Sequence, residues 1–220
     1  MILSRGRKYL FVHIPKTGGT ALAQALEARA MADDLLVGDT PKARKRRGRL
    51  RDVKTAGRLW KHSTLAEAEG LYHRDELDDL YIFTLVRNPW DRTVSYYHWL
   101  RAQSFDHPAV TTAKAHDFSG FLHDPSMQAS LQAHPYSWYL RDGAGVQRPA
   151  HYIRLEHFAK DAAALEAHLG FALTPLPKVN VSDRPRDYRR FYSDEDAALL
   201  GRLNRANCAQ FGYEFDRSYI

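Results

Sequence analysis

The sequence is almost without cysteine, since Cys208 is the only one among 220 residues. A single thiol excludes an intramolecular disulfide and any cysteine-rich metal site. Long apolar runs are missing as well: no stretch approaches the roughly 20 residues that a membrane span needs. The run 9–14 is too short and too interrupted for the core of a signal peptide. We therefore expect no transmembrane segment and a cytoplasmic protein. The single cysteine fits the reducing conditions of the cytoplasm.

Acidic residues are fewer than basic ones. The chain has 26 Asp and Glu against 32 Lys and Arg, which gives a formal net charge of +6 and a pI of about 9.4. Such a balance favours anionic partners, which include nucleotides, acidic glycans, nucleic acid and membrane surfaces, and it does not choose among them.

The basic residues concentrate in one segment, 39–54, that has almost no apolar residues. Self-repulsion predicts that this segment forms an extended, mobile loop at about 39–58 unless an anion binds it. Two interpretations stay open, a solvated loop and a docking surface for an acidic acceptor. The basic residues are Lys42, Arg44, Lys45, Arg46, Arg47, Arg49, Arg51 and Lys54.

The chain length and a hydrophobic content of 44% are typical of one globular domain, 1–220. Apolar runs at 9–14, 80–86 and 151–155 indicate buried strands, and each precedes a helical pattern. We expect the main helices to begin at Thr20, to span 89–101 and 156–169, and to span 193–210 with Ser193 as the cap. Repeated strand–helix units predict an α/β, P-loop-like three-layer fold with a central parallel sheet flanked by helices.

A glycine-rich turn joins the first predicted strand to its helix. Gly18 and Gly19 let the backbone approach an anion, and the start of the helix adds positive potential. Lys16 supplies a mobile charge, while Thr17 and Thr20 supply hydroxyl donors. The turn predicts a polyanion site, but it is not a Walker A loop, because the lysine precedes both glycines. It reads His13-Ile14-Pro15-Lys16-Thr17-Gly18-Gly19-Thr20.

A second anchor follows the second predicted strand. Arg87 lies at the carboxyl end of that strand, the edge where open α/β sheets bind ligands. Ser95 follows about two helical turns later, so its hydroxyl can face the same side as the helix start. An arginine and a hydroxyl that converge there could hold a second phosphate. We expect Asp91 and Arg92 to form an internal ion pair or cap that braces the turn.

The two motifs together resemble the PAPS-dependent carbohydrate sulfotransferase family, soluble bacterial relatives of the Golgi enzymes that sulfate glycans. PAPS is 3′-phosphoadenosine 5′-phosphosulfate. The glycine-rich turn is similar to the family's 5′-phosphosulfate loop, and the Arg87 segment is similar to its 3′-phosphate element. The resemblance covers nearly the whole chain and continues through Arg154-Leu155-Glu156, Phe158, Asp161, Asn180-Val181-Ser182 and Phe211-Gly212-Tyr213.

The resemblance implies site residues. Lys16 would contact the sulfate and the bridging oxygen, and Arg87 with Ser95 would hold the 3′-phosphate. His62 lies where the family often places its general base, so Lys16 and His62 are the predicted catalytic residues. His13 is interpreted as structural. The implied donor-binding residues are Lys16, Thr17, Gly18, Gly19, Thr20, Arg87 and Ser95.

The implied reaction moves a sulfuryl group from PAPS to a hydroxyl of a carbohydrate, such as a glycan or glycolipid, and leaves adenosine 3′,5′-bisphosphate. His62, with an ordinary pKa near 6.5, would take the hydroxyl proton near neutral pH. Lys16 would stabilise the charge that builds on the leaving oxygen. No metal is expected, because cations and backbone donors already hold the leaving group.

Three alternatives belong to other classes. An ATP-dependent P-loop kinase would need a metal-binding acid where the second strand ends, and Arg87 stands there. A nucleic-acid-binding protein would account for the basic segment, yet no strand shows the aromatic-plus-basic pattern of an RNA platform. A catalytically inactive nucleotide-binding relative would share every binding feature.

Several aromatic and histidine residues leave the acceptor open. The residues that could line a carbohydrate cleft or belong to the core are Trp99, Arg101, Tyr136, Trp138 and Tyr139. His98 and His107 could line a cleft or lie on the surface. Glycan, lipid-linked sugar, small hydroxylated metabolite and peptide tyrosine, in that order, all stay open as the acceptor. The sulfated position, the residues that stack on the adenine, and the oligomeric state are not readable from the sequence.

Overall fold

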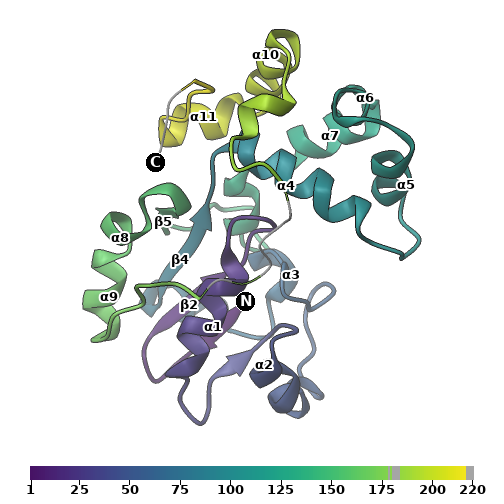
Figure 1. Ribbon diagram of the computed structural model, residues 1–220. Helices are drawn as coiled ribbons and strands as arrows, with labels where there is room; N and C mark the ends of the chain where they lie inside the picture. Colours follow the sequence, from purple (N-terminus) through teal and green to yellow (C-terminus); the bar gives the residue numbers. More distant parts are fainter. Residues whose placement is uncertain (178, 180–183, 217–220) are drawn as a thin grey trace. The chain divides into compact units, whose positions relative to one another are not determined.

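The computed structural model describes residues 1–177, 179 and 184–216, and Figure 1 shows its course. The chain forms two compact units. Unit 1 comprises Met1–Val86 and Tyr136–Asn180, and unit 2 comprises Arg87–Pro135 and Val181–Ile220. Whether both fold together as one domain, as the length suggests, stays a prediction. Among the described residues, no helix is long and apolar enough to span a membrane.

Unit 1 contains a five-stranded sheet with the order β3-β1-β2-β4-β5. Strands β2, β4 and β5 are parallel, which confirms the central parallel sheet. Strands β1 and β3 form an antiparallel edge that was not predicted, because three and two residues are too few to show a periodic pattern. The strands are β1 (Ile2–Ser4), β2 (Tyr9–Val12), β3 (Leu35–Leu36), β4 (Tyr81–Val86) and β5 (His151–Arg154).

Register places the carboxyl ends of β2 and β4 at one edge of the sheet. Val12 pairs with Thr84, and the Thr84 hydroxyl donates to the Val12 carbonyl at 2.7 Å. All four residues of β2 are buried, as expected for a parallel strand covered on both faces. The α/β, P-loop-like fold with a central sheet flanked by helices is therefore confirmed.

One face of the sheet packs against α1 (Gly19–Ala28), α8 (Phe158–Asp161) and α9 (Ala163–Leu169). Each large apolar side chain buried there contributes about 1.5–3 kcal/mol. This packing holds α1 against β2, and it therefore fixes both ends of the turn that joins them. The contributing residues include Tyr9, Phe11, Leu22, Leu26, Phe83, Leu85, Ile153, Phe158, Leu165 and Leu169.

The remaining helices of unit 1 are short. The α-helices are α2 (Pro41–Arg46) and α3 (Leu65–Ala68), and the 3₁₀ helices are Arg47–Leu50, Arg74–Asp79, Tyr136–Leu140 and Leu155–His157. The predicted helix 156–169 is divided into the last of these 3₁₀ helices, α8 and α9.

The expectation of an extended loop at 39–58 was wrong for residues 41–50, which form α2 and a 3₁₀ helix. The Thr40 side chain accepts from the Ala43 N–H at 3.1 Å, and Pro41 occupies the first turn. Both features favour helix initiation. Sequence reasoning weighed charge repulsion and overlooked this start signal.

Unit 2 is helical among its described residues. The predicted helix 89–101 is confirmed as α4, while the predicted helix 193–210 is interrupted at Asn204. Ser193 caps α10 as expected. The helices are α4 (Pro89–Arg101), α5 (Pro108–Ala115), α6 (Phe118–His123), α7 (Pro125–Ala133), the 3₁₀ helix Tyr188–Phe191, α10 (Asp194–Leu203) and α11 (Arg205–Phe211).

The aromatic residues that were left open divide between core and surface. Tyr136 and Tyr139 are buried in unit 1, so they belong to its core. Trp99 is 37% exposed in unit 2, and its ring stacks on Tyr96 at 6.1 Å.

Candidate functional site

The turn between β2 and α1 has an unusual backbone. Lys16 has φ 64° and Gly18 has φ 89°, so two left-handed residues occur within three positions. A left-handed lysine costs about 1–2 kcal/mol and persists only where its surroundings enforce it. Thr17 helps to do so, because its fully buried hydroxyl donates to the Ile14 carbonyl at 2.8 Å. The Thr17 hydroxyl thus braces the turn, and its donation to an anion stays a prediction.

The start of α1 has no cap. Gly18 occupies the cap position without a side chain, and no acidic residue lies in the first turn. The first N–H groups of a helix have no partners within the helix. An uncapped start also carries the positive end of the helix dipole, so it suits an anion. Thr20 is half-buried there and makes no hydrogen bond through its hydroxyl within the described parts of the chain.

Both glycines of the turn are also required by packing. A Cβ on Gly19 would lie 2.1 Å from Cδ2 of His13, and a Cβ on Gly18 would lie 2.9 Å from Cδ1 of Leu155. The His13 ring thus fills the space that Gly19 leaves beside α1, and it stacks on Phe11 at 5.7 Å. A structural role for His13 fits this position.

His62 contacts the same turn. Its Nδ1 lies 2.8 Å from the His13 carbonyl oxygen, which can only accept, so Nδ1 carries the proton and Nε2 keeps its lone pair. The ring also meets His13 edge-on at 4.5 Å. Sequence reasoning placed His62 by resemblance, and the structure brings it together with the loop through His13.

The pKa of His62 is lower than the ordinary value near 6.5 that we expected. Burial, with a smaller effect of the Lys61 charge, lowers its pKa from 6.5 to about 3, although the bond to His13 opposes the shift. Burial also lowers the pKa of His13 well below its usual value. Both rings are neutral at physiological pH, so His62 is already in the form that can accept a proton.

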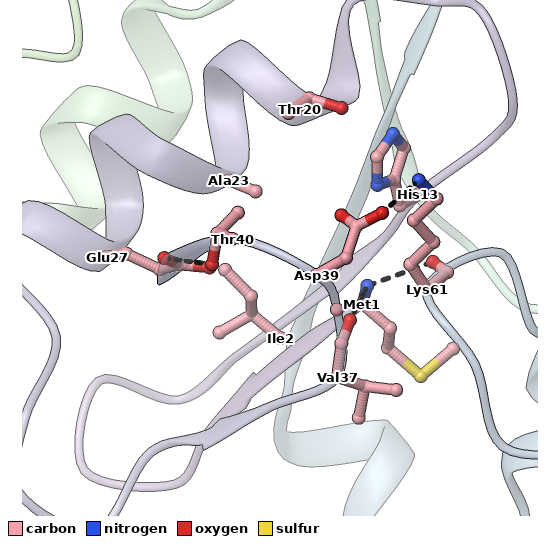
Figure 2. Close-up of a pocket in the computed structure, with 11 residues that line it drawn as sticks. Met1, Ile2, His13, Thr20, Ala23, Glu27, Val37, Asp39, Thr40 and Lys61 are labelled. Carbon is pink, nitrogen blue, oxygen red and sulfur yellow. Dashed lines mark hydrogen bonds and ion pairs between the residues drawn. The ribbon is translucent and has the colours of Figure 1, made fainter. Parts of the chain in front are cut away.

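A small pocket beside this turn lies within unit 1 (Figure 2). Its wall joins residues of the turn, His13 and Thr20, to residues before α2. Asp39 and Lys61 form an ion pair at 2.6 Å on this wall. On its other side the Thr40 hydroxyl donates to the buried Glu27 carboxylate at 2.6 Å. The lining is Met1, Ile2, His13, Thr20, Ala23, Glu27, Val37, Gly38, Asp39, Thr40 and Lys61.

The second anchor, in unit 2, begins with a capped helix. The Asn88 side chain accepts from the N–H groups of Trp90 and Asp91 at 3.0 and 3.3 Å. Arg87 donates through Nε and Nη2 to Oδ2 of Asp91 at 2.9 and 2.6 Å. Arg184 donates to Oδ1 of the same carboxylate at 2.5 Å. Asp91 therefore pairs with Arg87 and Arg184 instead of the expected Arg92.

Ser95 lies one turn after Asp91 on α4 and is 5% exposed. His98 follows one turn later, and its buried Nε2 has no hydrogen-bond partner among the residues that the structure describes. Burial and the charges of Arg184 and Arg101 lower the pKa of His98. Sequence reasoning missed Arg184, because no local pattern connects it to a helix that ends more than 80 residues earlier.

The other residues singled out have structural roles. His107 caps α5, since its Nδ1 accepts from the Ala109 N–H at 3.1 Å. Arg154 and Asp161 form an ion pair at 2.7 Å beside β5. Cys208 is half-buried, and burial raises its pKa to about 11, so an unreactive thiol fits. The segment 180–182 lies outside the described residues. No cluster of three or more potential metal ligands occurs within 1–177, 179 and 184–216.

The chain is similar to known sulfotransferases. A family model described as "Sulfotransferase family" matches residues 1–208. Among solved structures, the mouse sulfotransferase SULT7A1 complexed with PAP has a similar fold, with a TM-score of 0.52 and 14% identity over 96% of this chain and 87% of that one. A sulfotransferase from Alicyclobacillus acidocaldarius aligns with a TM-score of 0.36 and 18% identity over 92% and 97% of the two chains. No curated protein matches the chain.

Proposed function

The chain belongs to the sulfotransferase family, and we propose that it transfers a sulfuryl group from PAPS to a hydroxyl of a carbohydrate. The observation that carries the proposal is the uncapped start of α1, where Lys16 and Gly18 take left-handed conformations. A helix start without a side-chain cap offers its N–H groups to a polyanion. The PAP named with the mouse structure is consistent with a donor of this class.

The two anchors would divide the donor between them. In this proposal, the N–H groups of the turn and the Thr20 hydroxyl bind the 5′-phosphosulfate, together with Lys16. Arg87 and Ser95 bind the 3′-phosphate. Asp91 already orients the Arg87 guanidinium by a two-point contact, and a fixed guanidinium loses little freedom when it meets a phosphate.

The reaction is an in-line displacement at sulfur. His62 takes the acceptor's hydroxyl proton at Nε2, and the oxygen forms a bond to sulfur. The bond between sulfur and the bridging oxygen breaks, and its electron pair leaves with the 5′-phosphate as adenosine 3′,5′-bisphosphate. Lys16 offsets the charge on that oxygen. Positioning and charge stabilisation supply most of the rate in such transfers.

The His13 carbonyl is what suits His62 to this role. It holds the proton on Nδ1, so that the lone pair is always on Nε2. A pKa of about 3 makes His62 a weak base, but it is unprotonated throughout the neutral range. We therefore expect no acidic limb near pH 6.5 in the rate profile from this residue.

The test is release of adenosine 3′,5′-bisphosphate from PAPS with a panel of glycan and glycolipid acceptors. Acceptor-dependent release is expected, and His62→Gln should reduce turnover by roughly 10²–10⁴. His116→Gln is a matched control, because His116 is exposed and its side chain makes no hydrogen bond among the described residues. Magnesium-dependent turnover of ATP without release from PAPS would instead establish the kinase alternative.

A further inference from the structure

The positive charge of the protein is localised in one segment. Residues 42–54 contain eight Lys and Arg and one acid, Asp52, so their formal charge is 8 − 1 = +7. The whole chain carries +6, which leaves −1 for all other residues. The high pI therefore comes from this one short segment, because the rest of the chain is close to neutral.

This stretch is anchored to the last turn of α1 and to the loop that follows the helix. Three of its side chains, Lys42, Arg46 and Arg49, donate to the backbone carbonyls of Glu27, Met31 and Ala32. Cations at that end are favourable, because the last carbonyls of a helix carry partial negative charge. These contacts hold the segment in place in spite of its self-repulsion.

The other five cations form what we name the basic surface. All five are exposed, and none of their side chains makes a hydrogen bond or ion pair within the described residues. Adjacent cations without acidic partners repel one another, which destabilises the folded protein. A polyanion that binds all five would remove this repulsion. The basic surface consists of Arg44, Lys45, Arg47, Arg51 and Lys54.

The chain leads from the basic surface directly to the candidate base. Ala56 and Gly57 donate their N–H groups to the carbonyls of Glu69 and Glu67, so this connection is ordered. Trp60 follows and is 41% exposed, with the Arg58 guanidinium 5.6 Å from its ring centre. The same ring meets His62 edge-on at 5.0 Å. An exposed tryptophan beside the base can stack on a sugar ring while that sugar presents its hydroxyl.

The distance between these features sets the size of the ligand. The segment that carries the basic surface is bonded through Lys42 to Glu27 in the last turn of α1, whereas the phosphate-binding turn leads into the N-terminal end of α1. Ten helical residues span about 15 Å. A small metabolite bound at the turn would not reach the far end of α1, but a polymer with repeated negative charges would.

We propose that the basic surface and Trp60 form an acceptor-docking site for an anionic polysaccharide, which holds the polymer while one of its hydroxyls reaches His62. This inference rests on the proposed function. A nucleic acid could also satisfy the charges, but Trp60 lies beside His62, where the acceptor hydroxyl must be, and this favours a sugar polymer.

The experiment is calorimetric titration with heparin oligosaccharides of increasing length at several salt concentrations. Affinity should rise from disaccharide to dodecasaccharide. Replacing three cations of the basic surface, R44Q/K45Q/R47Q, should weaken dodecasaccharide binding at least about tenfold and lower the slope of log K against log salt by about 2–3. The control K114Q/R202Q/R205Q removes the same charge from three exposed positions in unit 2 and should change neither quantity appreciably.

Trp60 is tested by comparison with another exposed tryptophan. Trp60→Ala should weaken dodecasaccharide binding severalfold, and Trp99→Ala should not. Equal heparin affinity of wild type and R44Q/K45Q/R47Q would overturn the inference. So would tighter binding to a single-stranded RNA of matched charge than to heparin.

A parallel titration with adenosine 3′,5′-bisphosphate separates the two proposals. Nucleotide binding with heparin affinity unchanged in R44Q/K45Q/R47Q would overturn only the docking site. Loss of heparin affinity in that variant, in a protein that binds no nucleotide, would overturn the proposed function and with it the role of the surface in acceptor docking.

Discussion

The strand-to-helix junctions that carry the two proposed anchors, from β2 to α1 and from β4 to α4, are built in opposite ways. The junction from β2 to α1 has a glycine at the cap, left-handed Lys16 and Gly18, and no acid in the first turn. The junction from β4 to α4 has an Asn88 cap, Pro89 in the first turn, and Asp91 close behind. The first leaves its N–H groups for a ligand, and the second satisfies them from within.

The difference indicates which groups do the binding at each place. An uncapped helix start binds through backbone, so its specificity lies in the turn geometry. A capped start has no such donors to offer, and binding must come from side chains, here Arg87 and Ser95. Asp91 then serves to orient arginines, since both Arg87 and Arg184 donate to it.

The largest expected effect comes from Lys16. Lys16→Ala should reduce turnover by about 10²–10³, the cost typical of losing one donor to a developing negative charge. Lys8→Ala is a close control, because Lys8 is exposed and also has a left-handed backbone, with φ 52°. Steady-state kinetics on both variants would refute the assignment of Lys16 if the two lost the same activity.

Gly19→Ala tests whether the first junction depends on close packing. The new Cβ must displace the ring of His13. The backbone carbonyl of the same residue orients His62. We expect a loss of about 1–3 kcal/mol in the free energy of unfolding, as for overpacked cores, and a fall in turnover. Gly48→Ala is the control, because a Cβ there would meet no atom of another packed element within 4 Å among the described residues. Wild-type turnover in Gly19→Ala would show that the His13 ring can move without consequence.

The pH dependence of stability tests the two neutral histidines of the first junction. Burial lowers the pKa of His13 and of His62 in the folded protein below the unfolded value of 6.5. Their contribution is therefore complete above pH 6.5 and is lost as the pH falls toward about 3 for His62. The loss approaches about 1.4 kcal/mol per pH unit for each histidine. Urea denaturation between pH 7.5 and 5 should show a shallower dependence in His62→Gln, and an identical dependence would contradict the burial of this ring.

The smallest effect is expected at the second junction. Asn88→Ala removes the cap of α4 and should cost about 1 kcal/mol of stability, as measured by thermal unfolding. Turnover at saturating donor should stay near the wild-type value, because the cap only supports the helix. A loss as large as that of Lys16→Ala would mean that the second junction, like the first, takes part in the chemistry.

The sequence predicted much of the fold for identifiable reasons. Continuous apolar runs marked β2, β4 and β5, and Asn88-Pro89 marked the start of α4. Strands β1 and β3 are too short for periodicity to reveal them. Residues 41–50 were expected to be extended because repulsion was weighed without the carbonyls that receive Lys42, Arg46 and Arg49, which lie in the last turn of α1 and in the loop after it.

The candidate site divides in the same way. Lys16, Gly18 and Gly19 were found from local pattern, and His62 from resemblance. Three features had no local signal: the bond from Thr17 to Ile14, the link from His62 to the His13 carbonyl, and the contact of Arg184 with Asp91. The last two join residues 49 and 93 positions apart, so only the fold reveals them.

The most direct test is calorimetric titration with adenosine 3′,5′-bisphosphate and ADP. If Arg87 binds the 3′-phosphate of the PAPS product, the bisphosphate should bind with micromolar affinity and ADP much more weakly. Arg87→Ala should abolish most of the preference for the bisphosphate over ADP, because Arg87 is assigned to the 3′-phosphate. Lys16→Ala should leave this preference unchanged. Equal affinity for both nucleotides, or a preference that survives Arg87→Ala, would contradict the assignment of the second junction to the 3′-phosphate.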